Sequence, residues 1–295
     1  MGLGSPLSWG SRPKPRGILA AFLLALAGCG EDSSTVPDNS MRVDTTAKAR
    51  TDTSGTCSTN CDASPPSIPV LTDSVSYGDV TTYGGTNNAN PSSGGACLYG
   101  ATGITHYAAI QVSRIPGDLR GQWNGGRICG QCFEVRARTA TGWKSTHVRI
   151  TDKCPDDRCG IDLGGAPATD LMDAQAGRYA GQWRPISCAG LSGVSDGTPT
   201  LFVKDGSNAW WSLVQVRNPP SAVTGIRMRP DRLPETWDTL SWASEAENYF
   251  KVPPAILSDS NTAYALEIRY RLADPIATKI SPKNLAVGGK SVPLP

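Results

Sequence analysis

Two aspartates in the segment 149–165, RITDKCPDDRCGIDLGG, are of the residue type and spacing that acid/base chemistry uses. Asp152 follows the short apolar-polar run 147–151, and Asp162 lies between Ile161 and Leu163. Alternation in a strand turns those two neighbours inward and the Asp162 carboxylate outward. Glycosidic bond cleavage needs a proton donor and a separate base or nucleophile. Aspartates also cap turns, which is the alternative interpretation.

The charge balance narrows the class of ligand. The 295 residues include 28 Lys and Arg and 26 Asp and Glu. Arg12, Lys14 and Arg16 precede Cys29 and no acid does, so 25 basic residues stand against 26 acidic ones from Cys29 onward. A chain this close to neutral has no electrostatic reason to bind nucleic acid. We expect the protein to be a monomer, to need no cofactor and to bind neutral polysaccharide.

The first 29 residues predict export. Three basic residues precede the apolar run ILAAFLLALA, which is too short to span a bilayer and ends in LAGC at Cys29. This ending resembles a bacterial lipobox, so we expect lipidation of Cys29 and a secreted or cell-surface lipoprotein. Membrane contact would come only through that anchor. Ordinary signal cleavage nearby is the alternative. Residues 30–70 are rich in Ser, Thr, Asp and Pro and predict a disordered tether.

Six cysteines lie between residues 71 and 190. In a small exported domain they predict structural disulfides, with a connectivity that sequence leaves open. The CGQC segment 129–132 could also be a zinc half-site or a redox motif, but the two histidines of the chain are not at ligand spacing from it. We therefore predict no metal. The six are Cys97, Cys129, Cys132, Cys154, Cys159 and Cys188.

Periodicity predicts two β domains, 71–190 and 198–290. Strands are expected at 133–138, 147–151 and 184–188, with one helix that has Pro167 in its first turn. The predicted face of that helix comprises Leu171, Met172, Gln175, Ala176 and Tyr179. The second region predicts a sandwich of antiparallel strands. Its last alternation places four residues on one face, namely Leu266, Ile268, Tyr270 and Leu272.

Five motifs, in this order, give the chain a resemblance to expansins across residues 74–286. They are GGACLYG (94–100), CGQCFEV (129–135), VRITDKCP (148–155), GIDLGG (160–165) and AWWSLVQVRN (209–218). The resemblance implies a mainly β fold. It consists of a six-stranded double-psi β-barrel followed by an immunoglobulin-like β-sandwich that binds carbohydrate.

The resemblance also assigns roles in the barrel groove. Asp152 matches the essential aspartate, the position of the general acid in related inverting cellulases, and Asp162 matches a second acidic position. Thr82 and Tyr83 match a groove Thr-Tyr pair. The base of the cellulases would follow Tyr83, where this chain has glycine. Asp79 is a conceivable substitute, three residues and about 10 Å of strand before Thr82. Asp162 is the other candidate, but in the family its match accompanies proteins without hydrolytic activity.

In the second domain the resemblance implies an aromatic platform for sugar rings. Trp210 and Trp211 are adjacent, so a regular strand would turn one ring inward. The turn signal DGSNA before them favours a bend that exposes both. The third ring is assigned to Tyr249, which alternates against Phe250, with Trp242 as the alternative.

These observations favour a non-hydrolytic wall-loosening protein that binds cellulose and matrix polysaccharides. Three alternatives stay open. A β-1,4-endoglucanase would need a base that the motifs do not supply. A peptidoglycan lytic transglycosylase is suggested by a resemblance of VRITDK and IDLG to rare lipoprotein A. A purely adhesive protein would carry an inactive barrel.

Overall fold

The computed structural model describes residues 75–84, 90–112, 123–156, 158–171, 177–233, 235–243, 246, 248–259 and 261–295. All of them fall within one compact unit, Asp62–Pro295. The predicted signal segment, the tether and Cys29 lie outside the described residues. Within those residues, no helix is long and apolar enough to cross a membrane.

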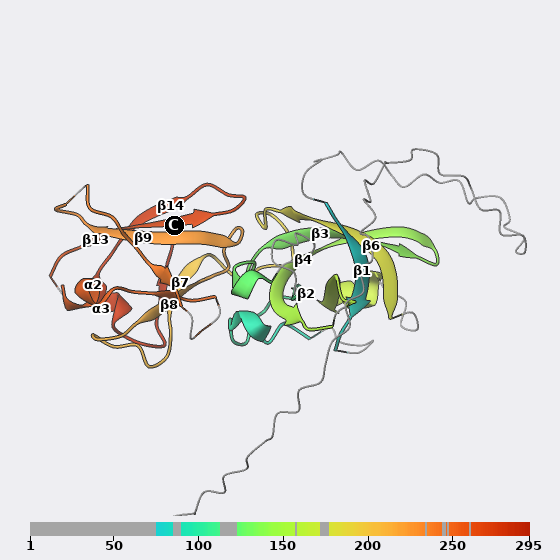
Figure 1. The fold of residues 1–295 in the computed structure, drawn as a ribbon, viewed down its shortest axis with the longest axis horizontal. Coiled ribbons are helices and arrows are strands. Elements are labelled where there is room, and N and C mark those ends of the chain that lie inside the picture. Colours follow the sequence, from blue (N-terminus) through green and yellow to red (C-terminus); the bar gives the residue numbers. More distant parts are fainter. Residues whose placement is uncertain are drawn as a thin grey trace, which may run out of the picture. The chain divides into compact units, whose positions relative to one another are not determined.

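The first part of the unit is a closed barrel of six strands (Figure 1). Their order around the barrel is β1-β5-β2-β4-β3-β6, with parallel pairing of β1 to β5 and of β2 to β4. The strands are β1 (Ser76–Thr82), β2 (His106–Gln111), β3 (Cys132–Thr139), β4 (Gly142–Cys154), β5 (Ile161–Gly165) and β6 (Arg178–Ile186). Two 3₁₀ turns, η1 (Gly95–Cys97) and η2 (Asn124–Gly126), lie in the connections.

Strand alternation separates the barrel interior from its outer face. Val80, Ala108, Ile150 and Leu163 belong to the buried cluster that fills the barrel. Their neighbours along the strands therefore point outward, and Asp162 is one of them because Ile161 and Leu163 are fully buried. The predicted orientation of Asp162 is confirmed.

The predicted helix is present but does not extend to Tyr179, contrary to what the spacing of apolar residues in the sequence predicts. α1 (Ala166–Leu171) has Pro167 in its first turn, as expected, and residues 172–176 lie outside the described residues. Tyr179 is not helical. It lies in β6, where it pairs with Val80. Long-range pairing to β1 thus overrides the local helical spacing.

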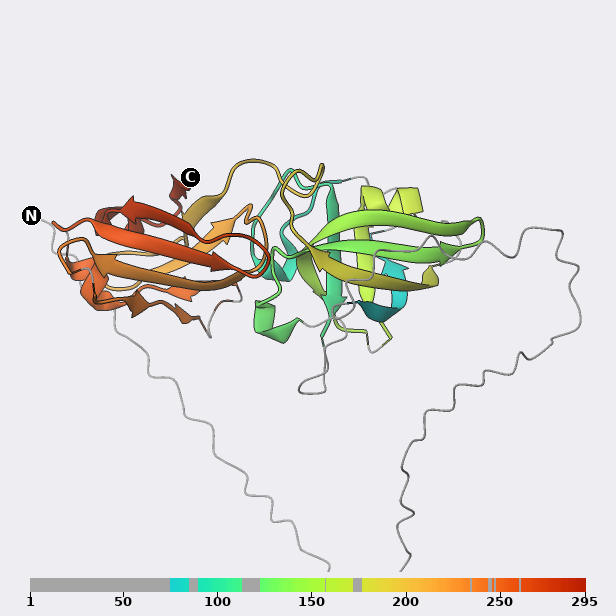
Figure 2. The same cartoon turned by 90° about the horizontal axis from the view of Figure 1, so that it is seen from above.

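The second part is a sandwich of two antiparallel sheets, as predicted. One sheet has the order β10-β9-β13-β14 and the other β11-β12-β8-β7-β15. Strands β13 and β14 lie side by side in orange and red (Figure 2). The strands are β7 (Thr200–Val203), β8 (Leu213–Arg217), β9 (Val223–Pro230), β10 (Asp238–Thr239), β11 (Ser241–Trp242), β12 (Phe250–Lys251), β13 (Tyr264–Tyr270), β14 (Ile276–Ile280) and β15 (Ser291–Pro293).

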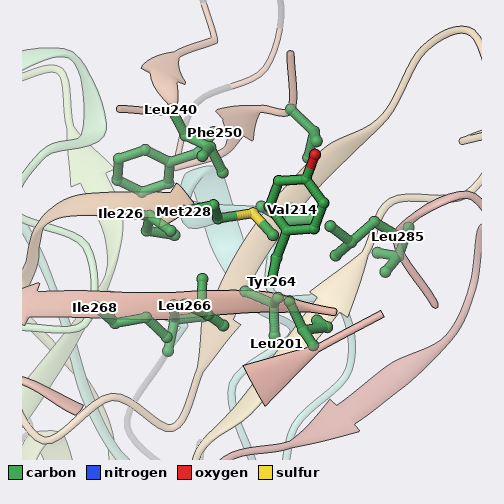
Figure 3. Close-up of a cluster of buried hydrophobic side chains, with 14 of the residues drawn as sticks. Leu201, Val214, Ile226, Met228, Leu240, Phe250, Tyr264, Leu266, Ile268 and Leu285 are labelled. Atoms are coloured by element: carbon green, nitrogen blue, oxygen red, sulfur yellow. The ribbon is translucent and has the colours of Figure 1, made fainter. Parts of the chain in front are cut away.

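Apolar side chains from both sheets meet between the layers. Leu201 and Val214 come from one sheet and Ile226, Met228 and Leu266 from the other (Figure 3). Two short helices, α2 (Pro254–Ser258) and α3 (Pro282–Leu285), add Ile256, Leu257 and Leu285 to this core.

The predicted alternation of the last long strand holds for Leu266 and Ile268, which are buried, and for Tyr270. It fails for Leu272, which is 42% exposed. β13 ends at Tyr270 after a register shift between Arg269 and Tyr270, so Leu272 lies beyond the sheet.

Candidate functional site

The two aspartates lie on neighbouring strands on the outer face of the barrel. In the sheet register, Ala109 of β2 is opposite Asp162 of β5 on one side and opposite Asp152 of β4 on the other. Two strand spacings separate the two aspartate Cα atoms by roughly 10 Å. Both residues therefore lie on one face of the barrel, on either side of Ala109, where the resemblance places the groove.

A β-bulge gives Asp152 its direction. The register of β2 and β4 shifts between Ala108 and Ala109, so that Thr151 is the extra residue of β4. Ile150, before the bulge, points into the barrel core. An extra residue re-aims the side chain that follows it. Asp152 consequently shares the outer face with Ala109.

Two backbone amides hold the carboxylate of Asp152. Its Oδ1 accepts hydrogen bonds from Ala96 N and Lys153 N, each at 2.8 Å. Its Oδ2 has no hydrogen bond to a described residue. Gly95 makes this approach possible, because its φ is +46° and a Cβ there would lie 2.6 Å from Asp152 Cγ. One carboxylate oxygen thus anchors the side chain while the other can accept from a ligand.

Asp162 is tied to a threonine that the sequence analysis did not select. Thr81 Oγ1 donates to Asp162 Oδ1 at 2.6 Å, across the parallel pair of β1 and β5. Burial raises the pKa of Asp162, and the Thr81 hydrogen bond acts in the opposite direction. Thr82, the predicted groove threonine, pairs instead with Leu163 of the barrel core. Thr81, rather than Thr82, is therefore the threonine that shares the outer face with Asp162.

Tyr83 lies beside the acids, as the resemblance implied. Its ring packs against Ala109 and the Cys154–Cys159 bridge, and it meets Tyr107 edge-on at 5.9 Å between centroids. Burial raises the pKa of the phenol far above its ordinary value, and the negative charge of Asp152 adds to this. Tyr83 therefore stays neutral and offers the groove a hydroxyl group and a ring.

Asp79 does not serve as a free base. Its carboxylate pairs with the guanidinium of Arg178 at 2.6 Å. Arg178 also contacts Asp156 at 3.1 Å and donates to the carbonyl of Arg158. An aspartate held in such a network is poorly placed to accept a proton from water.

The six barrel cysteines form three disulfides, which confirms their structural role. The pairs are Cys97–Cys129, Cys132–Cys188 and Cys154–Cys159. Among the described residues, the one cluster with metal-ligand types comprises Cys154, Cys159 and Asp162. Its two sulfurs are bonded to each other, so no thiolate remains to bind a metal.

The adjacent tryptophans precede β8 in a turn. Asn208 Oδ1 accepts from the amides of both Trp210 and Trp211. Trp210 is 84% exposed. Trp211 is only partly exposed, because it packs against an outer-face cluster that contains Leu213 and Tyr249. The expected bend is present, but it exposes one ring fully and the other in part.

The expectation that Tyr249 is exposed is wrong. The side chain is 3% exposed, and Phe250 is buried as well. Asn248 before them has a φ of +62°, which interrupts the extended backbone and with it the alternation of sides. Trp242, the alternative, packs on the core between the sheets and has Arg127 over its ring at 4.8 Å. Neither residue joins Trp210 as a third exposed ring.

Buried hydrogen bonds link the sandwich to the loop that holds Asp152. The amides of Gln215 and Asn248 donate to the carbonyl of Cys97, at 2.9 and 3.1 Å. Cys97 follows Ala96, whose N–H binds Asp152. The second domain therefore supports the loop that positions the groove carboxylate.

Comparisons with known proteins agree with this architecture. The chain is 35% identical over 118 residues to Expansin-B11 of Oryza sativa subsp. japonica and 23% identical over 108 residues to Expansin-like protein 1 of Dictyostelium discoideum. These matches cover 39% and 36% of this chain and 37% of each relative. No family model matches.

Two solved structures share the fold. The apo expansin of Clavibacter michiganensis superposes with a TM-score of 0.54 at 19% identity, and a mutant of it in complex with cellohexaose with 0.54 at 18%. Each match covers 74% of this chain and 95% of the other. Fold and site together define a β protein that joins a closed barrel to a two-sheet sandwich and carries two aspartates on one face of the barrel. The chain is thus similar to expansins, in sequence over about a third of its length and in fold over most of it, which agrees with the resemblance.

Proposed function

We propose that this chain is a non-hydrolytic cell-wall-loosening protein that binds cellulose and related β-1,4-glucans. A glucan chain lies in the groove between Asp152 and Asp162, and the aromatic surface at Trp210 and Trp211 holds a neighbouring chain. Polar contacts from the groove compete with the contacts between glycan chains. No covalent bond is broken.

The observation that carries this proposal is the state of the carboxylates around Asp152. Hydrolysis with inversion needs an ionised base that faces a water molecule. Asp79 is paired with Arg178, and Asp162 is partly buried, with a raised pKa and a hydrogen bond from Thr81. Asp152 itself keeps Oδ2 for a sugar hydroxyl. These features support glycan binding over water activation.

The exposed indole supports the second half of the proposal. Pyranose rings present flat faces of C–H groups that stack on aromatic rings. The solved expansin structure with cellohexaose shows that a protein of this fold binds a β-1,4-glucan oligomer. Stacking at Trp210, with Trp211 beside it, would give this chain an equivalent contact.

One observation favours a second function, an endoglucanase. Asp152 and Asp162 flank Ala109 with Cα atoms roughly 10 Å apart, and inverting enzymes place their carboxyl groups about 6.5–9.5 Å apart. In that case Asp162, whose pKa is raised, would be the acid and Asp152 the base.

Mechanical and chemical assays on the same protein separate the two functions. Wall loosening predicts weakening of cellulosic paper without release of reducing sugar, and Asp152→Ala should abolish the weakening. Soluble sugar release that is lost in both Asp152→Asn and Asp162→Asn would show an endoglucanase instead. Pull-down on peptidoglycan and on microcrystalline cellulose then identifies the polymer, and retention on peptidoglycan alone would contradict the proposal.

Export of the chain is part of the proposal. The barrel carries three disulfides, which persist in oxidising compartments. We propose that residues 1–29 act as the export signal and that Cys29 carries the lipid. Mass spectrometry of the mature chain tests this, because an acylated Cys29 at the new N-terminus is expected.

A further inference from the structure

A polar cavity lies where the barrel and the sandwich meet, lined by residues other than those around Asp152 and Asp162. Its volume is about 180 Å³. A single water needs roughly 10–15 Å³, so the cavity has room for a larger polar group. Arg149 and Tyr99 line it from the barrel, and Thr200, Arg217 and Ser291 from the sandwich.

Arg149 is the unusual member of this cavity. Its side chain is 1% exposed, and its Nη2 donates to the carbonyl of Pro219 at 2.9 Å. Its Nε and Nη1, which carry three of the five guanidinium N–H groups, have no partner among the described residues. Burial lowers the pKa of Arg149 to about 10, which leaves the group charged at neutral pH. Buried charges in proteins are normally paired, whereas Arg149 has no direct ion pair with a described residue.

The cavity wall carries a net positive charge. Arg149 and Arg217 contribute two cations, and Asp196 contributes one anion. Asp196 already accepts from Gly103 N at 2.6 Å, and no ion pair within 4.0 Å joins it to Arg149 in the described part of the chain. One further negative charge would balance the site. The remaining wall offers hydroxyl and amide groups at Thr102, Thr200, Asn218 and Ser291.

We propose that this cavity is a binding site for the carboxylate of an acidic sugar, a uronate unit of a matrix polysaccharide. A carboxylate carries the single negative charge that the wall lacks, and guanidinium N–H groups bind it well. The hydroxyl and amide groups suit the hydroxyls of the same sugar. The choice of a sugar acid rests on the proposed glycan binding, whereas the anion site rests on the unpaired guanidinium N–H groups of Arg149 and on the net charge of the wall.

Titration of the full chain with galacturonate and glucuronate, in buffer free of other oxyanions, tests the site. Calorimetry and melting temperature should show saturable binding that glucose does not reproduce. Acetate and sulfate are the comparison anions. Equal binding of acetate would refute the sugar half of the proposal, and no uronate binding at all would refute the site.

Variants locate the effect in this cavity. Arg149→Met should abolish uronate binding, and Arg217→Gln should weaken it at least roughly tenfold. Asp196→Asn should strengthen it several-fold, because it removes a like charge, and a merely structural role of Arg149 predicts no such gain. Arg138→Gln, an exposed barrel arginine, is the charge-matched control and should change nothing. If Arg149→Met does not fold, Arg217→Gln and Asp196→Asn decide the matter.

The same titration on Asp152→Ala distinguishes uronate binding in this cavity from glycan binding in the groove. That variant should bind uronate like the parent chain while it fails to weaken paper. Uronate binding that survives in both arginine variants, or that is lost in Asp152→Ala, would overturn the assignment to this cavity.

Discussion

Truncation of Trp210 to alanine tests the aromatic surface without disturbing the fold. The side chain is 84% exposed, so its removal takes almost nothing from the core. If a stacked sugar hides about 80 Å² of the ring, the lost contact is worth about 2 kcal/mol at about 25 cal/mol per Å². This corresponds to roughly thirtyfold weaker binding per site.

The assay is depletion of the protein from solution by microcrystalline cellulose, together with the melting temperature of each variant. Trp210→Ala should weaken binding and leave the melting temperature unchanged. Trp211→Ala should reduce both, because Trp211 packs against the cluster with Leu213 and Tyr249. Trp237→Ala is the control, because its ring contacts Arg227 and Arg229 of β9, in the sheet that does not contain β8. This change should leave cellulose binding unaltered. Binding of Trp210→Ala within twofold of the parent chain would refute the stacking argument.

Three further predictions concern the groove and its support. Gln215→Ala combined with Asn248→Ala removes two hydrogen bonds to Cys97, each worth about 1 kcal/mol, and should speed hydrogen exchange at the Ala96 amide; unchanged exchange would contradict the link between the domains. The raised pKa of Asp162 means that the folded state favours the protonated carboxyl. This carboxyl therefore stabilises the fold fully at a pH below its pKa in the unfolded chain, and the stabilisation is lost as the pH rises through its pKa in the folded state. Asp162→Asn should therefore raise the melting temperature at pH 7 but not at pH 3, and an equal effect at both would refute the assignment. Replacement of Cys132 and Cys188 by serine opens a loop with a sequence separation of 56 and should lower the free energy of unfolding by about 4 kcal/mol, measured by urea denaturation.

Local patterns predicted the parts of this structure that depend on neighbours in sequence. The side of Asp162 followed from the alternation of Ile161 and Leu163, and the bend before Trp210 followed from its turn residues. The role of Thr81 could not be read in this way, because it depends on the pairing of β1 with β5, about eighty residues along the chain. A shift of one residue exchanges the faces of a strand, so Thr82, which the resemblance assigns to the groove, lies on the same side of β1 as the buried Val80.

Tyr249 shows a different reason for failure. The alternation rule needs an extended backbone, and β12 contains only Phe250 and Lys251. The left-handed conformation of Asn248 just before it turns both aromatic rings into buried sites, one in each hydrophobic cluster of the sandwich. Asparagine tolerates this conformation better than most residues, so Asn248 was the signal that the strand begins late.

Strand β8 provides a physical connection between the two binding surfaces of the proposal. Leu213 packs in the cluster that supports Trp211, and Gln215 lies on the same face, about 7 Å further along the strand. Gln215 binds Cys97, next to the residue whose amide holds Asp152. A glycan bound at the tryptophans and one bound in the groove would therefore act on one rigid element. This arrangement suits a protein that moves one glycan chain against another. It predicts that Gln215→Ala weakens the loosening of paper more than it weakens cellulose binding.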